Sequence, residues 1–150
     1  MYGIKYTILR YANVYGIRQE PKGEGGVISI FLDKMLRGEQ PTIFGDGSNT
    51  RDYTYVEDIA EANLKALYHG DNEIFNIGTG KATDLNRLFD IMKKLIGFKG
   101  DAIYGPFRPG DIKDSCLCND KAVGSLKWEW KYSIEKGLEK TIKYYKEKYV

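Results

Sequence analysis

The residues best suited to chemistry lie in one short stretch, which reads GDGSNTRDYTYVED and runs from Gly45 to Asp58. Its glycines and small polar side chains predict a tight loop with nothing apolar to bury. The loop delivers Arg51 and Tyr53 to the mouth of a helix, because Thr54-x-x-Glu57 fits a capping box ahead of an apolar helical pattern. A guanidinium beside free backbone N–H groups suits a phosphate. The alternative is an ion pair between the arginine and a nearby carboxylate such as Asp52 or Asp46.

Three further polar residues come from other parts of the chain. Asn13 lies near the end of a predicted strand, where ligands bind in open α/β sheets; its alternative role is a local cap on the turn before Gly16. Arg108 and Asp111 lie in a loop that two prolines and two glycines make rigid. Together with Arg51 they could hold a diphosphate and a ribose, because arginine donates paired hydrogen bonds to phosphate and carboxylates accept from ribose hydroxyls. Spacing alone does not show that these residues converge.

Two other motifs have simpler explanations. Gly78-x-Gly80-x-x-Thr83 follows a predicted strand at the position of a dinucleotide-binding fingerprint, but it lacks the third glycine. A glycine turn between strand and helix explains it, and an independent nucleotide loop is the alternative. Tyr-x-x-x-Lys occurs as Tyr132/Lys136 and as Tyr144/Lys148, a spacing that is catalytic in short-chain dehydrogenases. Both copies fall on a lysine-rich helix, where chance matches are expected.

Composition narrows the class of protein. The 150 residues fit one ordinary domain, with 42% hydrophobic and 29% charged residues. A net charge of +2 does not favour nucleic acid as a partner. The sequence contains no run of 18 apolar residues, so no membrane span is predicted. The start of the chain lacks a signal-peptide pattern. Cys116 and Cys118 are too closely spaced for an unstrained bridge and too few for a metal site. We therefore expect no metal and a reducing, cytoplasmic location.

The elements that must position these residues alternate between strands and helices. Residues 5–15 predict one strand that is apolar on both faces, which is typical of the interior of a parallel sheet. Because nothing precedes this strand, the chain is expected to begin partway through a larger fold. Further strands are predicted at 41–44, 73–77 and 101–104, and helices at 26–36, 54–69, 83–96, 121–126 and from Ser133 onward.

Within the helix predicted at 54–69, the residues expected on its apolar face are Val56, Ile59, Ala60, Asn63 and Leu67. The chain shows no repeat, low-complexity tract or linker. We therefore expect residues 1–150 to form a single unit of the α/β class.

Five motifs occur in order along the chain: LRYANVYG, GEGGVISIF, FGDGSNTRDYTYVEDIA, FNIGTG and RPGDI. Together they resemble the C-terminal half of the extended short-chain dehydrogenases, the NAD-dependent sugar-nucleotide epimerase/dehydratase family. The nearest likeness is to the UDP-glucose 4-epimerases, and it runs from about residue 2 to the end of the last helix. The motifs separate epimerases less well from dTDP-glucose dehydratases and UDP-glucuronate decarboxylases, so these remain alternatives.

The resemblance implies roles residue by residue. Asn13 and Arg51 would contact the substrate diphosphate with Arg108 beside them, and Asp111 would accept a hydrogen bond from the ribose. The nucleobase pocket would be lined by Gly26, Val27, Thr42, Ile43 and Phe44, partly through backbone groups. Tyr53 matches a family tyrosine next to the substrate pocket, and Tyr11 matches a position near the nicotinamide of NAD.

The resemblance also implies what is missing. The family's glycine-rich NAD loop belongs to an N-terminal dinucleotide-binding half, and its catalytic Tyr-x-x-x-Lys falls just before the position matched by Met1. In the family reaction a hydride passes from the sugar to NAD and back, with the tyrosine as base, and no residue here matches that step. We therefore expect a substrate-binding part of an extended Rossmann-type epimerase that binds the UDP of a UDP-sugar. It is not expected to be catalytic alone, and little or no NAD binding is expected.

A non-catalytic docking role is the alternative to substrate binding. An unpaired strand exposes backbone N–H and C=O groups that can pair with another strand. The first strand would then pair with a separate N-terminal Rossmann half or with a second copy of the chain.

Overall fold

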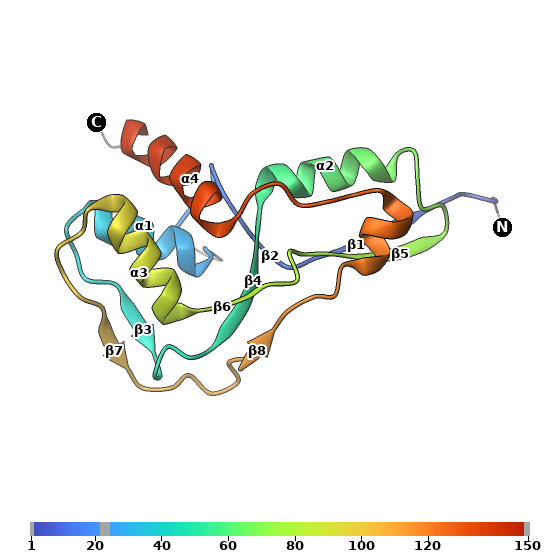
Figure 1. The fold of residues 1–150 in the computed structure, drawn as a ribbon. Coiled ribbons are helices and arrows are strands. Elements are labelled where there is room, and N and C mark those ends of the chain that lie inside the picture. The colour runs from blue at the N-terminus through green and yellow to red at the C-terminus, as the bar shows by residue number, and fades with distance from the viewer. Residues whose placement is uncertain (1, 22–24, 149–150) are drawn as a thin grey trace.

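The computed structural model describes residues 2–21 and 25–148, in which short strands alternate with helices (Figure 1). The elements are β1 (Thr7–Tyr11), β2 (Asn13–Tyr15), α1 (Val27–Leu36), β3 (Thr42–Phe44), β4 (Thr50–Tyr55), α2 (Val56–Ala66), β5 (Glu73–Ile77), β6 (Ala82–Asp84), α3 (Leu85–Ile96), β7 (Ile103–Gly105), β8 (Asp114–Ser115), the π-helical turn η1 (Ala122–Leu126) and α4 (Ile134–Lys148). The mixed α/β class is as predicted. No helix in these two ranges is long and apolar enough to cross a membrane.

Strand β4 organises the sheets. It pairs with β2 in parallel, with β6 in antiparallel orientation, and with β8 in parallel at its first two residues. Two smaller parallel sheets join β1 to β5 and β3 to β7. Figure 1 shows β4 running between the group formed by α1, α3 and α4 and the group formed by β1, β5 and α2. Strand β4 therefore links the two groups of elements.

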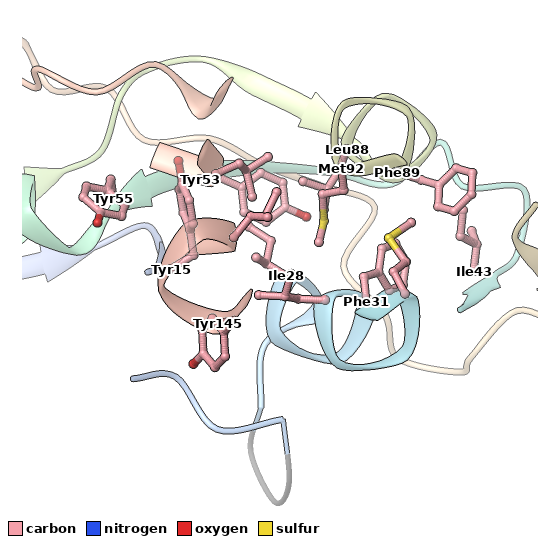
Figure 2. Packing of buried hydrophobic residues seen from close by; sticks show 14 residues of the cluster. Tyr15, Ile28, Phe31, Ile43, Tyr53, Tyr55, Leu88, Phe89, Met92 and Tyr145 are labelled. Carbon is pink, nitrogen blue, oxygen red and sulfur yellow. The ribbon is translucent and has the colours of Figure 1, made fainter. Parts of the chain in front are cut away.

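The main hydrophobic core lies between α1, α3 and α4 and the second half of β4 (Figure 2). The rings of Phe31 on α1 and Phe89 on α3 meet edge to face, with their centroids 6.4 Å apart. Tyr15 of β2 packs against both Tyr53 and Tyr55 of β4. These aromatic contacts fix the helices against the strand, and such pairs add to the stability gained from burial alone.

A second cluster lies between α2, β5 and η1, and the fully buried Trp128 belongs to it. The indole N–H of Trp128 donates to the backbone oxygen of Asp58 at 2.8 Å. The Asp58 carboxylate accepts from the backbone N–H groups of Lys131 (2.9 Å) and Tyr132 (3.2 Å). Burial raises the pKa of Asp58 in spite of these bonds. One aspartate on α2 thus holds the segment that leads into α4.

The prediction of one continuous strand over 5–15 is wrong. The ladder breaks at Ala12, because β1 pairs with β5 whereas β2 pairs with β4. The N–H of Ala12 donates to the oxygen of Ile77 (2.9 Å), so this residue marks the change of neighbour. Among the described residues β1 is paired on one side only, and Ile8 is 45% exposed.

The capping box predicted at Thr54 is also wrong. Thr54 and Tyr55 belong to β4, and α2 begins at Val56 without a side-chain cap. The strand continues through the expected cap because Thr54 and Tyr55 pair with Val14 and Tyr15. The helix buries Asp58, Ile59 and Ala62, whereas Ala60, Asn63 and Leu67 of the predicted face are exposed.

Several local predictions are confirmed. The strand over 73–77 has the expected bounds, and the hydroxyl of Ser133 accepts from the N–H of Lys136 (3.3 Å) at the start of α4. Helix α3 begins two residues later than predicted, because residues 82–84 first pair with β4 as β6. Asp84 caps α3 by accepting from the N–H of Arg87 at 2.8 Å.

Candidate functional site

A cavity of about 210 Å³ opens beside β4, α1, β3 and the loop between β7 and β8. It is lined by Asn13, Val27, Phe31, Thr42, Phe44, Asn49, Arg51, Tyr53, Leu85, Arg108 and Asp111. Eight of the ten residues expected to bind substrate are in this lining. Apolar side chains and two guanidinium groups therefore meet around one space.

Strand β4 delivers the polar side of the cavity. Successive side chains of a strand point to opposite faces, so the alternate residues Arg51 and Tyr53 share one face. Asn49, which lies immediately before the strand, lines the same cavity. The Nη1 group of Arg51 donates to the backbone oxygens of Thr50 (2.7 Å) and Lys113 (3.5 Å). Its Nε and Nη2 groups make no hydrogen bond to any residue that the structure describes, which leaves charged donors for a ligand.

The ion-pair alternative for Arg51 is not formed. The carboxylate of Asp46 accepts instead from the N–H (2.9 Å) and the hydroxyl (2.5 Å) of Ser48. The Ser48 hydroxyl bond is the main reason why the pKa of Asp46 is lowered. The other neighbouring carboxylate, Asp52, points to the opposite face of β4 and binds the turn at Thr79.

The loop that carries Arg108 is held at both ends by strand pairing. At one end β7 pairs with β3, and at the other β8 pairs with β4, where the Thr50 hydroxyl also donates to Asp114 Oδ1 (2.7 Å). In the middle, the ring of Phe107 occupies the space that a side chain at Gly45 would fill. The Arg108 guanidinium stacks on the Phe44 ring, with its carbon 3.5 Å from the ring centroid. The loop is thereby seated over the cavity.

Tyr53 has an unusual environment for a polar side chain. It is 5% exposed, and its hydroxyl finds no partner among the described residues. Burial raises its pKa to about 12, although the positive charge of Arg51 works in the opposite direction. The hydroxyl is therefore protonated at neutral pH, and a buried donor without a partner is costly unless a ligand or water accepts from it.

Three of the predicted site residues lie outside the lining. Ile43 is fully buried in the core, while its strand neighbours Thr42 and Phe44 line the cavity. Gly26 immediately precedes α1. Tyr11 ends β1, where its hydroxyl donates to Asn63 Oδ1 at 3.0 Å. The roles implied for these residues stay predictions.

Asp52 has a structural role that the sequence analysis did not predict. It is 1% exposed, and Oδ1 accepts from the N–H (2.9 Å) and hydroxyl (2.6 Å) of Thr79. Oδ2 accepts from the N–H groups of Gly80 (3.1 Å) and Leu117 (3.4 Å). The alternation along β4 could have indicated this role, because it places Asp52 on the face opposite Arg51.

The glycine turn over residues 78–80 does not fit a nucleotide phosphate. Its N–H groups at Thr79 and Gly80 already point at the Asp52 carboxylate, which occupies the place of an anion. Strand β6 also separates the turn from the start of α3, so the turn does not open a helix as a dinucleotide loop does. The interpretation as a turn between elements is the one that these contacts support.

The remaining motifs of the sequence lie outside the cavity. The Tyr132 hydroxyl donates to Glu57 Oε2 (2.6 Å), and Lys140 donates to Glu57 Oε1 (2.6 Å) and lowers the Glu57 pKa. The second Tyr-x-x-x-Lys includes the side chain of Lys148, which is outside the described part. Both cysteines are free and exposed, and the described residues contain no group of three or more metal-binding side chains.

Comparisons with known proteins identify the family of the chain. A model of the NAD dependent epimerase/dehydratase family matches residues 1–78. A UDP-glucose 4-epimerase of Mycolicibacterium smegmatis is 36% identical over 149 residues, which are 99% of this chain and 48% of that protein.

Two solved structures of relatives superimpose closely on this chain. The UDP-glucose 4-epimerase of Thermotoga maritima, solved with UDP-glucose, has a TM-score of 0.97 at 52% sequence identity. The match covers 99% of this chain and 48% of the Thermotoga chain. The UDP-N-acetylglucosamine 4-epimerase of Methanobrevibacter ruminantium, solved with UDP-N-acetylmuramic acid, has a TM-score of 0.93 at 35% sequence identity. The match covers 98% of this chain and 48% of the Methanobrevibacter chain.

The chain thus spans about half the length of the relatives that it matches, and its mixed α/β fold corresponds to part of an extended Rossmann-type fold. The family match covers more than half of the chain, and the relatives above match nearly all of it. The protein belongs to the NAD dependent epimerase/dehydratase family.

Proposed function

We propose that this chain is the substrate-binding half of an NAD-dependent UDP-sugar 4-epimerase, which interconverts UDP-glucose and UDP-galactose through a 4-keto intermediate. Residues 1–150 act as one unit that holds the UDP part of the substrate. The observation that carries this proposal is the convergence of eight expected substrate residues, drawn from distant parts of the chain, on one cavity. The UDP-sugars in the two solved relatives support the class of ligand.

The chemistry of the lining suits UDP. Val27 and Phe44 offer apolar surfaces for a flat base, and Arg51 and Arg108 bring two positive charges for a diphosphate. Asn13 lies across the β2–β4 ladder from Tyr53, so its amide can join the phosphate end. Asp111 is placed to accept from a ribose hydroxyl.

The same proposal assigns NAD and the hydride transfer to the remainder of the protein. The N–H of Gly80 donates to the Asp52 carboxylate, so the 78–80 turn is not open to a nucleotide phosphate. The Tyr132 hydroxyl donates to Glu57, so it is not free to act as a catalytic base. This chain then binds UDP without catalysing epimerisation alone and binds NAD little or not at all. The corresponding half of a dTDP-glucose dehydratase or a UDP-glucuronate decarboxylase is the alternative, and the names of the relatives favour the epimerase.

A docking surface accompanies this role. The described part of the chain pairs β1 on one side only, and Tyr6, Ile8 and Tyr11 remain half exposed along it. Leu67 and Tyr68, which follow α2, are also exposed. We propose that an N-terminal Rossmann half, or a second copy of the chain, covers this surface by pairing with β1. A clean monomer by size-exclusion chromatography at high concentration would contradict self-association.

The proposed function is tested by an NMR titration of the purified chain, first with UDP and then with NAD. We expect dispersed amide signals, with those of the cavity residues moving on addition of UDP and remaining in place with NAD. A well-dispersed spectrum that ignores UDP would contradict the proposal. A response to NAD that Gly80→Val abolishes and Arg51→Ala leaves intact would instead support the nucleotide-loop alternative.

A further inference from the structure

We propose that Asn49 is a further substrate-binding residue, whose side-chain amide hydrogen-bonds the nucleoside part of the ligand and not its diphosphate. The inference rests on the proposed function and deepens it. It assigns a contact to a residue that the motif comparison did not single out.

The first observation is a cavity-lining amide that makes no hydrogen bond to the described residues. Asn49 is 8% exposed and lines the cavity. Its carboxamide makes no hydrogen bond to any residue of 2–21 or 25–148, although such a group offers two donors and two acceptor sites. Because the residue borders the cavity, a ligand there is the partner within reach.

The turn that contains Asn49 does not need this amide. Its geometry is already held by the Asp46 carboxylate, which accepts from Ser48, and by the Asn86 side chain, which donates to the Asp46 backbone oxygen at 2.9 Å. Leu85 adds a backbone bond from its N–H to the oxygen of Gly47 at 3.0 Å. Among the described residues, no contact of the Asn49 side chain therefore supports a purely structural role.

Position along β4 indicates which part of the ligand the amide meets. Arg51 and Tyr53 follow one another on one face of β4 at an interval of roughly 6.6 Å, because two residues of a strand rise by about that distance. Asn49 lies one residue before the strand begins and lines the same cavity, on the far side of Arg51 from Tyr53 in sequence. Tyr53 pairs across the sheet with Asn13, which places that amide at the far end. With Arg51 on the diphosphate, Asn49 is on the opposite side of the phosphate from Asn13.

The residues around Asn49 suit a nucleoside. The turn begins where β3 ends at Phe44, and the backbone bond between Leu85 and Gly47 brings the apolar Leu85 to the same end of the cavity. A uracil ring offers carbonyl oxygens and an N–H, and a ribose offers hydroxyls. A carboxamide complements these mixed groups because it both donates and accepts, whereas a diphosphate only accepts.

The test compares three ligands that divide the substrate: UDP, UMP and inorganic pyrophosphate. We expect Asn49→Leu to weaken UDP and UMP by roughly three- to tenfold, the loss of one neutral hydrogen bond. We expect the same variant to bind pyrophosphate with unchanged affinity. Asn63→Leu is the matched control, because it makes the same change at a residue of α2 that does not line the cavity. 2′-Deoxy-UMP distinguishes a ribose contact from a base contact.

A second measurement needs no substitution. The side-chain NH₂ signals of Asn49 are expected to shift when UMP is added and to stay in place with pyrophosphate. Equal weakening of UDP and pyrophosphate in Asn49→Leu would place the amide on the phosphate and overturn the inference. If Arg51→Ala weakens UDP while Asn49→Leu and the NH₂ signals show no effect, the inference fails and the proposed function stands. If Arg51→Ala is also without effect, both fail.

Discussion

Replacing Arg51 by alanine is the most direct test of the proposed diphosphate contact. The structure leaves Nε and Nη2 of this guanidinium without partners among the described residues, on the face of β4 that lines the cavity. A hydrogen bond to a charged group contributes about 1.5–3 kcal/mol. We therefore expect Arg51→Ala to weaken UDP binding by about 10- to 140-fold.

The substitution also has a cost in stability that is separable from binding. It removes the Nη1 bonds to the backbone oxygens of Thr50 and Lys113, of which only the second links β4 to the residue before β8. Bonds of this kind contribute roughly 0.5–1.5 kcal/mol. Thermal unfolding without ligand measures this loss, and isothermal titration calorimetry with UDP measures the loss of affinity.

Two comparisons make the result decisive. Arg10→Ala removes the same charge from an exposed position on β1 that is outside the cavity lining, so we expect it to leave UDP affinity unchanged. Arg108→Ala is expected to weaken UDP by a similar factor to Arg51→Ala. Unchanged affinity in both cavity variants, or an equal loss in Arg10→Ala, would refute the diphosphate assignment. Low ionic strength keeps the charge contribution measurable.

Three other substitutions probe the supporting contacts. Tyr53→Phe removes a buried donor without a partner, so we expect UDP affinity to fall by roughly three- to tenfold in calorimetry. The same variant loses part of the alkaline destabilisation: the folded pKa of Tyr53 is about 12, above the unfolded value of about 10, so its contribution to stability declines as pH rises through that window. Gly45→Ala forces an L side chain to φ +76° and into the Phe107 ring, so the loop that carries Arg108 moves and UDP affinity falls toward that of Arg108→Ala. Asp52→Asn removes the anion that holds the 78–80 turn, and urea denaturation is expected to show a loss of about 2–3 kcal/mol.

Each of these expectations has a contrary result. Wild-type UDP affinity in Tyr53→Phe would mean that the hydroxyl does not face the ligand. A Gly45→Ala chain that binds UDP normally would show that Phe107 does not position Arg108. Wild-type stability in Asp52→Asn would show that the carboxylate is not what holds the turn.

Local sequence patterns predict the elements that depend on local interactions. The apolar stripe of α3 and its glycine stop, the strand over 73–77 and the Ser133 cap all follow from residues close in sequence. The convergence of Arg51 with Arg108 does not, because nothing in the spacing brings together loops more than fifty residues apart. The family resemblance supplied that expectation.

The wrong predictions share one physical cause, which is pairing between distant segments. Thr54 has the local signature of a cap, but the neighbouring Tyr55 pairs with Tyr15 and the strand extends over both residues. Asp52 has the appearance of a surface residue in a polar loop, but contacts with Thr79 and Leu117 bury it. A local pattern holds no information about such partners, so their effect is visible only in the assembled fold.

The two faces of β4 also limit how the chain can change in length. Arg51 and Tyr53 face the cavity, whereas Thr50 and Asp52 bind Asp114 and the 78–80 turn. Inserting or deleting one residue in the preceding turn would exchange these two sets, because a shift of one position reverses every side chain of a strand. The arginine would then face the framework and the aspartate the ligand. Variation in length is therefore confined to segments that leave the phase of this strand unchanged.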